Sequence, residues 1–138
     1  YNANLNGGTA LMPRITPDGR YLLCTIAESG AFNLYHKESD FLMMDLQTGG
    51  LVDCSAINSP EAESYHAWSS SGRWMMYSSK QLDGRYTRLF LAYWDGKRWS
   101  KPFLLPQESP QQNTLLMMAY NVAEFVEDSV EPVTLDKP

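Results

Sequence analysis

The sequence contains one pattern twice, and the two copies lie 53 residues apart. The first copy is Thr16-Pro17-Asp18-Gly19-Arg20-Tyr21-Leu22-Leu23-Cys24-Thr25, and the second is Ser69-Ser70-Ser71-Gly72-Arg73-Trp74-Met75-Met76-Tyr77-Ser78. In both copies a polar turn ending in Gly-Arg precedes a run of residues that favour β-strands. A duplication with a period near 50 residues, built from short strands, is typical of propeller blades and related arrays.

Each copy predicts four short strands separated by turns. The strands predicted in the first copy are Ala10–Ile15, Tyr21–Ala27, Asp40–Leu46 and Leu51–Ile57. Those predicted in the second copy are Ser64–Ser69, Arg73–Ser79, Tyr86–Trp94 and Trp99–Leu105. Asp-Gly pairs between apolar runs are strong hairpin signals, and four aspartates are expected to stabilise their own turns: Asp18, Asp45, Asp83 and Asp95. The sequence therefore predicts two antiparallel four-stranded meanders.

The predicted fold is all-β, with two four-stranded antiparallel β-propeller blades and a C-terminal closing segment. We assign residues 1–58 to the first blade, 59–106 to the second, and 107–138 to the closing segment and tail. Within that last part, Thr114–Ala119 fits a helical turn or a strand, and Tyr120–Val126 fits a strand or an extended segment. Because a closed propeller needs at least ~4 blades, two blades leave apolar faces uncovered. We therefore expect a fragment of a larger propeller that self-associates when isolated.

Composition favours a folded protein that does not bind polyanions. The 138 residues are 43% hydrophobic and 12% aromatic, which is enough for a core. A net charge of −5 disfavours nucleic acid and anionic lipid as partners. The apolar runs are far shorter than the roughly 18 residues of a membrane span, so direct membrane insertion is not expected.

No catalytic, cofactor or metal site is predicted from the residue spacing. Two histidines and two separated cysteines do not form a zinc pattern. Cys24 and Cys54 fall on the second and fourth predicted strands, about 9 to 10 Å apart, so two unpaired thiols are expected. The serine cluster Ser69-Ser70-Ser71-Gly72 lacks the Gly-x-Ser-x-Gly pattern of a hydrolase nucleophile.

These residues resemble a known family. Thr16-Pro17-Asp18-Gly19-Arg20-Tyr21-Leu22 resembles the Ser-Pro-Asp-Gly-Arg signature of TolB-like propeller repeats, and the segment from Phe41 to Gly49 is similar to the strand that follows it. The stretch from Glu63 to Trp74 looks like the C-terminal part of a TolB-like subfamily from Bacteroidetes. This resemblance implies a six-bladed β-propeller in the periplasm or cell envelope that acts as a non-catalytic scaffold for a protein or peptide partner.

Seven residues are candidates for contact with such a partner: Tyr35, His36, Tyr65, His66, Arg85, Tyr86 and Arg88. His66 is expected on an innermost strand, where it faces the channel or hydrogen-bonds a neighbouring blade. His36 belongs to a long loop carried by the sheet, a common place for binding residues. The two arginines flanking Tyr86 suit an acidic peptide or a glycan, or ion pairs between blades.

Two other functions are open at this point. Prolyl-oligopeptidase-type enzymes carry a related propeller beside a hydrolase domain, so the chain could belong to such an enzyme. A carbohydrate-binding propeller would require the aromatic side chains of Tyr35, Tyr86 and Trp94 to form an exposed platform.

Overall fold

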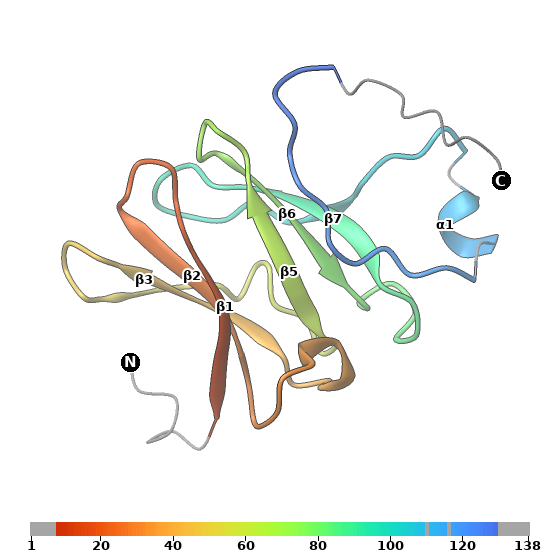
Figure 1. Ribbon diagram of the computed structural model, residues 1–138, viewed down its shortest axis with the longest axis horizontal. Coiled ribbons are helices and arrows are strands. Elements are labelled where there is room, and N and C mark those ends of the chain that lie inside the picture. Colours follow the sequence, from red (N-terminus) through yellow and green to blue (C-terminus); the bar gives the residue numbers. More distant parts are fainter. Residues whose placement is uncertain (1–7, 110, 116, 130–138) are drawn as a thin grey trace, which may run out of the picture.

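The chain forms two four-stranded antiparallel sheets of the same strand order, so the all-β prediction is confirmed. The computed structural model describes residues 8–109, 111–115 and 117–129. The first sheet contains β1 (Thr9–Ile15), β2 (Tyr21–Ala27), β3 (Asp40–Asp45) and β4 (Leu51–Val52). The second contains β5 (Glu63–Trp68), β6 (Trp74–Ser79), β7 (Arg88–Tyr93) and β8 (Phe103–Leu104). Figure 1 shows the two sheets side by side, the first in red to yellow and the second in green to cyan.

The sequence duplication is present in the backbone. Gly19 and Gly72, 53 residues apart, both adopt positive φ in the turn after the first strand of their sheet. The pairing of β1 with β2 shifts between Leu11 and Arg14, and that of β5 with β6 shifts between Ser64 and Ala67. Each bulge holds a side-chain-bearing residue in the left-handed region, Met12 at φ 52° and Tyr65 at φ 48°, again 53 residues apart. Such conformations are strained for residues other than glycine, so the bulge is a repeated feature of the fold.

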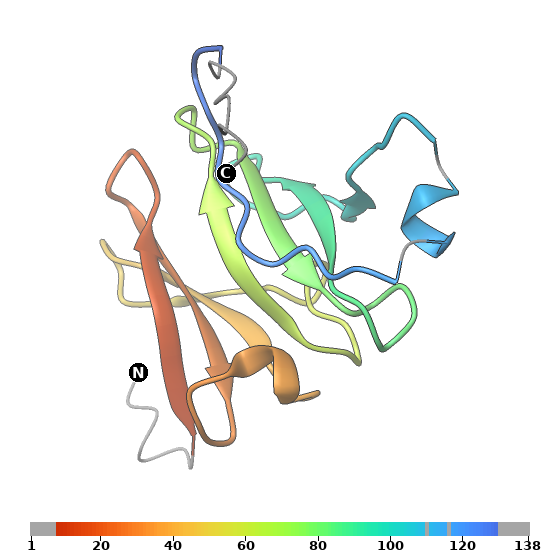
Figure 2. The same ribbon diagram turned by 45° about the vertical axis from the view of Figure 1, so that its right-hand side comes forward.

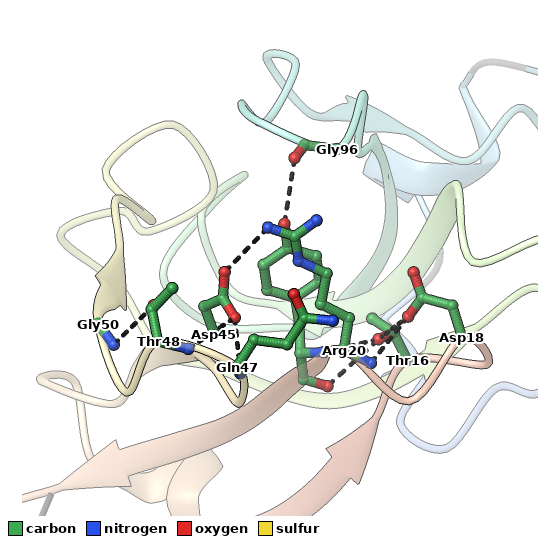
Figure 3. A network of polar contacts seen from close by, with 9 residues as sticks. Thr16, Asp18, Arg20, Asp45, Gln47, Thr48, Gly50 and Gly96 are labelled. Carbon is green, nitrogen blue, oxygen red and sulfur yellow. Dashed lines mark hydrogen bonds and ion pairs between the residues drawn. The ribbon is translucent and has the colours of Figure 1, made fainter.

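The turn aspartates behave as predicted. One carboxylate oxygen of Asp95 accepts the amides of Lys97 and Arg98, each at 2.7 Å. These bonds lower the pKa of Asp95. Asp18, Asp45 and Asp83 accept backbone amides in their own turns in the same way. Figure 3 shows two of these turns, joined by an ion pair of 3.1 Å between Arg20 and Asp45.

Three predicted strands are too long. The strand predicted over Leu51–Ile57 ends at Val52, because the Asp53 carboxylate accepts the amide of Ser55 and turns the chain. The strand predicted over Trp99–Leu105 is interrupted: Trp99 forms an isolated bridge with Trp94, and pairing resumes in β8 after Pro102, which has no amide to donate. The strand predicted over Tyr86–Trp94 starts later, at Arg88, because Asp83 binds the amides of residues 85 and 86 in the preceding turn.

Beyond β8 the described chain is mostly irregular. A short helix, α1 (Gln112–Leu115), overlaps the first two residues of the undecided segment Thr114–Ala119. Residues 117–119 are irregular, and Tyr120–Val126 forms no strand. The chain that follows α1, drawn in blue, crosses the second sheet in both views (Figures 1 and 2). It is attached where the Tyr120 amide donates to the Thr87 carbonyl at 3.0 Å, and where Glu124 pairs with Arg14 at 2.5 Å.

The core lies in the seam where the first sheet faces the second. Tyr21, Leu23, Phe41 and Met43 pack there against buried residues of β6 and β7, namely Met75, Tyr77, Phe90 and Ala92. The Tyr21 ring meets Trp94 edge-on at 5.3 Å, and its hydroxyl donates to the Gly96 carbonyl at 3.2 Å. Burial of these apolar side chains is the main force that holds the sheets together.

A carboxyl group is buried at one end of this seam. Glu63 is fully buried, and its carboxyl lies 2.6 Å from the Ser59 hydroxyl and 2.9 Å from the Ser79 hydroxyl. Its backbone amide donates to the carbonyl of Ser39 in the first sheet at 2.9 Å. Burial raises the pKa of Glu63 to about 7, although the serine contacts oppose the shift.

Glu63→Gln tests this buried acid. Between its unfolded pKa near 4.5 and its folded pKa near 7, the native state holds the proton more tightly than the unfolded chain. The free energy of unfolding of the wild type, relative to that of Glu63→Gln, should therefore fall by about 3 kcal/mol as the pH rises from about 4.5 to 8. Urea unfolding of both proteins across this range measures the difference; a constant difference would contradict the raised pKa.

Candidate functional site

Three of the seven candidate residues meet in one pocket at the end of the sheets. The pocket has a volume of about 400 Å³. Its lining comes from the β2–β3 connection, the β5 bulge, the β6–β7 loop and the C-terminal segment: Phe32, Leu34, Tyr35, Tyr65, Lys80, Arg85, Thr87, Ala119 and Asn121. We call it the loop pocket. Tyr35, Tyr65 and Arg85 were predicted as contact residues, and the fold brings them together.

The aromatic wall of the loop pocket is built on a single turn. The 3-10 turn η2 (Asn33–Tyr35) buries Asn33 and leaves the Tyr35 side chain 84% exposed, with the Phe32 ring edge-on at 6.3 Å. Lys80 approaches from the second sheet, and its ammonium donates to the Leu34 carbonyl at 2.5 Å and lies 5.6 Å from the Tyr35 ring centre. Lys80 was not among the predicted contact residues because it stands alone after β6, without a neighbouring motif.

The opposite wall is set by the β6–β7 loop and the C-terminal segment. The Asp83 carboxylate accepts the amides of Arg85 and Tyr86, each at 2.8 Å, which fixes the loop that presents the Arg85 side chain. The Thr87 hydroxyl donates to the side-chain oxygen of Asn121 at 2.6 Å. Because its oxygen is bound in this way, the amide nitrogen of Asn121 is left to donate elsewhere.

Tyr65 reaches the loop pocket because of the β5 bulge. Its left-handed backbone, at φ 48°, departs from the alternation of a regular strand and places it beside both the loop pocket and a second, smaller cavity. Strained residues of this kind cluster at binding sites and clamps. The hydrophobic periodicity of the sequence gives no sign of this strain. The strained Tyr65 nevertheless lies 53 residues after the strained Met12, so the conformation is part of the repeat.

His66 lies beside the second cavity and against the first sheet. The cavity is about 200 Å³, and Arg14, Val122 and Glu124 also line it. His66 is 1% exposed, its ring packs edge-on against Phe41 of the first sheet at 5.3 Å, and neither ring nitrogen has a partner among the described residues. Burial, reinforced by the charge of Arg14, lowers the pKa of His66 to about 4, so the ring is neutral at pH 7. The Leu23 backbone of the first sheet opposes this shift, although it lies outside normal hydrogen-bond geometry.

The other candidates lie apart from the loop pocket lining. Arg88 is buried, and its guanidinium donates to the carbonyls of Asn113, at 2.8 Å, and Met118. Arg88 therefore anchors the C-terminal segment. The Tyr86 ring lies beside it, with its centre 5.3 Å from the guanidinium carbon. His36 contacts Glu38 in its own loop at 3.1 Å.

The aromatic platform required for carbohydrate binding is not formed. Tyr35 is exposed, but Trp94 is only 3% exposed and packs in the seam against Tyr21. A side chain that closes the core is not available for stacking on a sugar. This aspect of the carbohydrate alternative is contradicted by the structure.

The described residues offer little to a metal ion. Within residues 8–109, 111–115 and 117–129, no three histidine, cysteine or acidic side chains gather closely enough to hold one. Cys24 and Cys54 have free, buried thiols, and burial raises the pKa of Cys54 to about 12. No helix in the described part of the chain has the length and apolar character needed to cross a bilayer.

Comparisons of the chain with protein-family models, curated proteins and solved structures found no match.

Replacing His66 with leucine tests whether the ring nitrogens are unpaired. Because no hydrogen bond is lost, His66→Leu should change the free energy of unfolding at pH 8 by less than about 1 kcal/mol. As the pH falls from 6.5 toward 4, only the unfolded histidine gains a proton, so the wild type should lose stability relative to the variant. Denaturant titrations at both pH values measure this. A loss above about 2 kcal/mol at pH 8 would reveal a hydrogen-bond partner and contradict the account.

Proposed function

We propose that the chain is two blades and the closing segment of a TolB-like β-propeller. The resemblance of Thr16–Leu22 to the TolB-like repeat motivates the assignment, and the geometry supports it: two meanders of equal strand order, each with the same bulge, pack face to face. In this proposal residues 1–58 and 59–106 are the blades, and 107–138 close the structure.

An exposed apolar face on the second sheet supports the presence of a further blade beside it. Trp74 stands 53 residues after Tyr21, the residue that packs across the seam. Tyr21 is 5% exposed, whereas Trp74 is 37% exposed. The Trp74 ring pairs with Tyr93 at 5.0 Å and Phe103 at 6.1 Å, both in its own sheet. We call Trp74, Tyr93 and Phe103 the outer aromatic face. By repeat symmetry its occupant is another four-stranded sheet.

The isolated chain should therefore self-associate through the outer aromatic face. Its sedimentation coefficient should rise with concentration across the micromolar range, because exposed aromatic area is buried on contact. Trp74→Lys should shift the equilibrium toward monomer, and Leu82→Lys, which changes an exposed apolar residue in the β6–β7 loop, should leave it unchanged. A wild type that stays monomeric throughout would count against the proposal.

We propose that this propeller portion is a non-catalytic scaffold that binds a protein or peptide in the cell envelope. The observation that carries the proposal is the loop pocket, where Tyr35, Tyr65 and Arg85 converge from three separate segments on a rigid pair of sheets. Aromatic and arginine side chains are the residues most enriched where binding energy is concentrated. Membership of a prolyl-oligopeptidase-type enzyme is the alternative, and the presence of a hydrolase domain in a longer polypeptide would favour it.

Peptide binding is measured by selecting ligands from a random peptide display library on the immobilised chain. Peptides recovered on the wild type should lose at least about tenfold in affinity on Tyr35→Ala, because an exposed aromatic contact is removed. Leu51→Ala, a change at an exposed apolar side chain of β4 outside both the loop pocket and the outer aromatic face, is the control and should bind normally. Failure to recover any peptide, or equal loss in both variants, would reject the loop pocket as the binding site.

A further inference from the structure

We propose that the loop pocket takes an acidic peptide segment in which carboxylates alternate with apolar side chains. This inference rests on the proposed peptide-binding function and names its ligand class. It is argued from the charges, the free donors and the apolar walls of the pocket.

The charge of the loop pocket is opposite to that of the chain. The chain has 11 basic and 16 acidic residues and a net charge of −5. Yet the charged side chains that line the loop pocket are Lys80 and Arg85, both basic. A cationic pocket on an acidic protein attracts an anion locally while the remaining surface repels polyanions such as nucleic acid.

The nearby acidic side chains have other partners. Glu61 lies beside Gly84 but pairs with Lys37 at 2.7 Å. Asp83 accepts the backbone amides of Arg85 and Tyr86 within its own turn. Neither carboxylate forms an ion pair with the Arg85 or Lys80 side chain among the contacts of the described residues. The charge of Arg85 acts on Asp83 at longer range, and both cations keep hydrogen-bond donors for a ligand.

The polar groups of the loop pocket are held in place before a ligand arrives. The Lys80 ammonium donates one of its three hydrogens to the Leu34 carbonyl and has two left to donate. The Asn121 side chain is oriented by Thr87, and its amide nitrogen is a third source of donors. The ammonium, guanidinium and amide nitrogen groups of the lining all donate, which fits a carboxylate that only accepts hydrogen bonds. Charge-assisted bonds of this kind are the strong ones.

The apolar walls of the loop pocket indicate that the ligand carries apolar side chains next to its carboxylate. Phe32 and Tyr35 are 68% and 84% exposed, which is unusual for aromatic side chains, and Leu34 and Tyr65 complete the wall. A free inorganic anion would leave these surfaces in water. A peptide that alternates acidic and apolar residues covers them and satisfies the cations together.

The test uses two arrays of labelled peptides and the full chain. The acidic array alternates Glu or Asp with aromatic and aliphatic residues, and the amide array replaces every Glu and Asp with Gln and Asn. Fluorescence anisotropy should show that acidic peptides bind at least about tenfold more tightly than their amide counterparts, as expected for loss of a hydrogen bond to a charged group. Added salt should weaken this preference.

Variants assign the preference to the loop pocket. Arg85→Gln and Lys80→Gln should each reduce it, and Lys101→Gln, an exposed lysine outside the pocket, should preserve it. Equal binding of both arrays, or an acidic preference that survives in Arg85→Gln and Lys80→Gln, would overturn the acidic ligand class while leaving peptide binding intact. Absence of binding to either array would overturn the peptide-binding function as well.

Discussion

Burial of apolar side chains in the seam between the two sheets is the interaction on which the rest of the structure depends. Tyr21, Leu23, Phe41 and Met43 lose their contact with water only because β6 and β7 cover them. This packing fixes the orientation of one sheet on the other. It therefore also fixes which loops share an end of the molecule, and the loop pocket exists because the β2–β3 connection and the β6–β7 loop end there together.

Two ionisable groups near this seam couple the packing to pH in opposite directions. The Glu63 carboxyl is buried and accepts hydrogen bonds from two serine hydroxyls and one backbone amide. His66 is buried, and neither ring nitrogen forms a hydrogen bond of normal geometry among the described residues. Burial disfavours the charged form of each, so it raises the pKa of the acid and lowers that of the base. Their effects on stability offset one another between about pH 4.5 and 6.5, which broadens the range in which the sheets stay packed.

The sequence was informative where local chemistry decides the structure. Five strand positions follow closely from β-favouring runs bounded by Gly and Asp turns, and the turn aspartates accept the amides expected of them. The outermost strands were overestimated because Asp53 ends pairing and Pro102 interrupts it inside apolar runs. Only part of the loop pocket could be predicted from the sequence, because the position of Lys80 depends on a tertiary contact with Leu34. The burial of Trp94 was missed for the same reason: Tyr21, which packs against it, is far away in the sequence.

The most direct test of the seam is the nuclear Overhauser effect between Tyr21 and Trp94 in the full chain. Their ring centres are 5.3 Å apart although the residues belong to different sheets. The account predicts cross-peaks between the Tyr21 ring protons and the Trp94 indole, together with cross-peaks from Trp74 to Tyr93 within the second sheet. Cross-peaks within each sheet without any between Tyr21 and Trp94 would show that the sheets form but do not pack in this way, and would contradict the account.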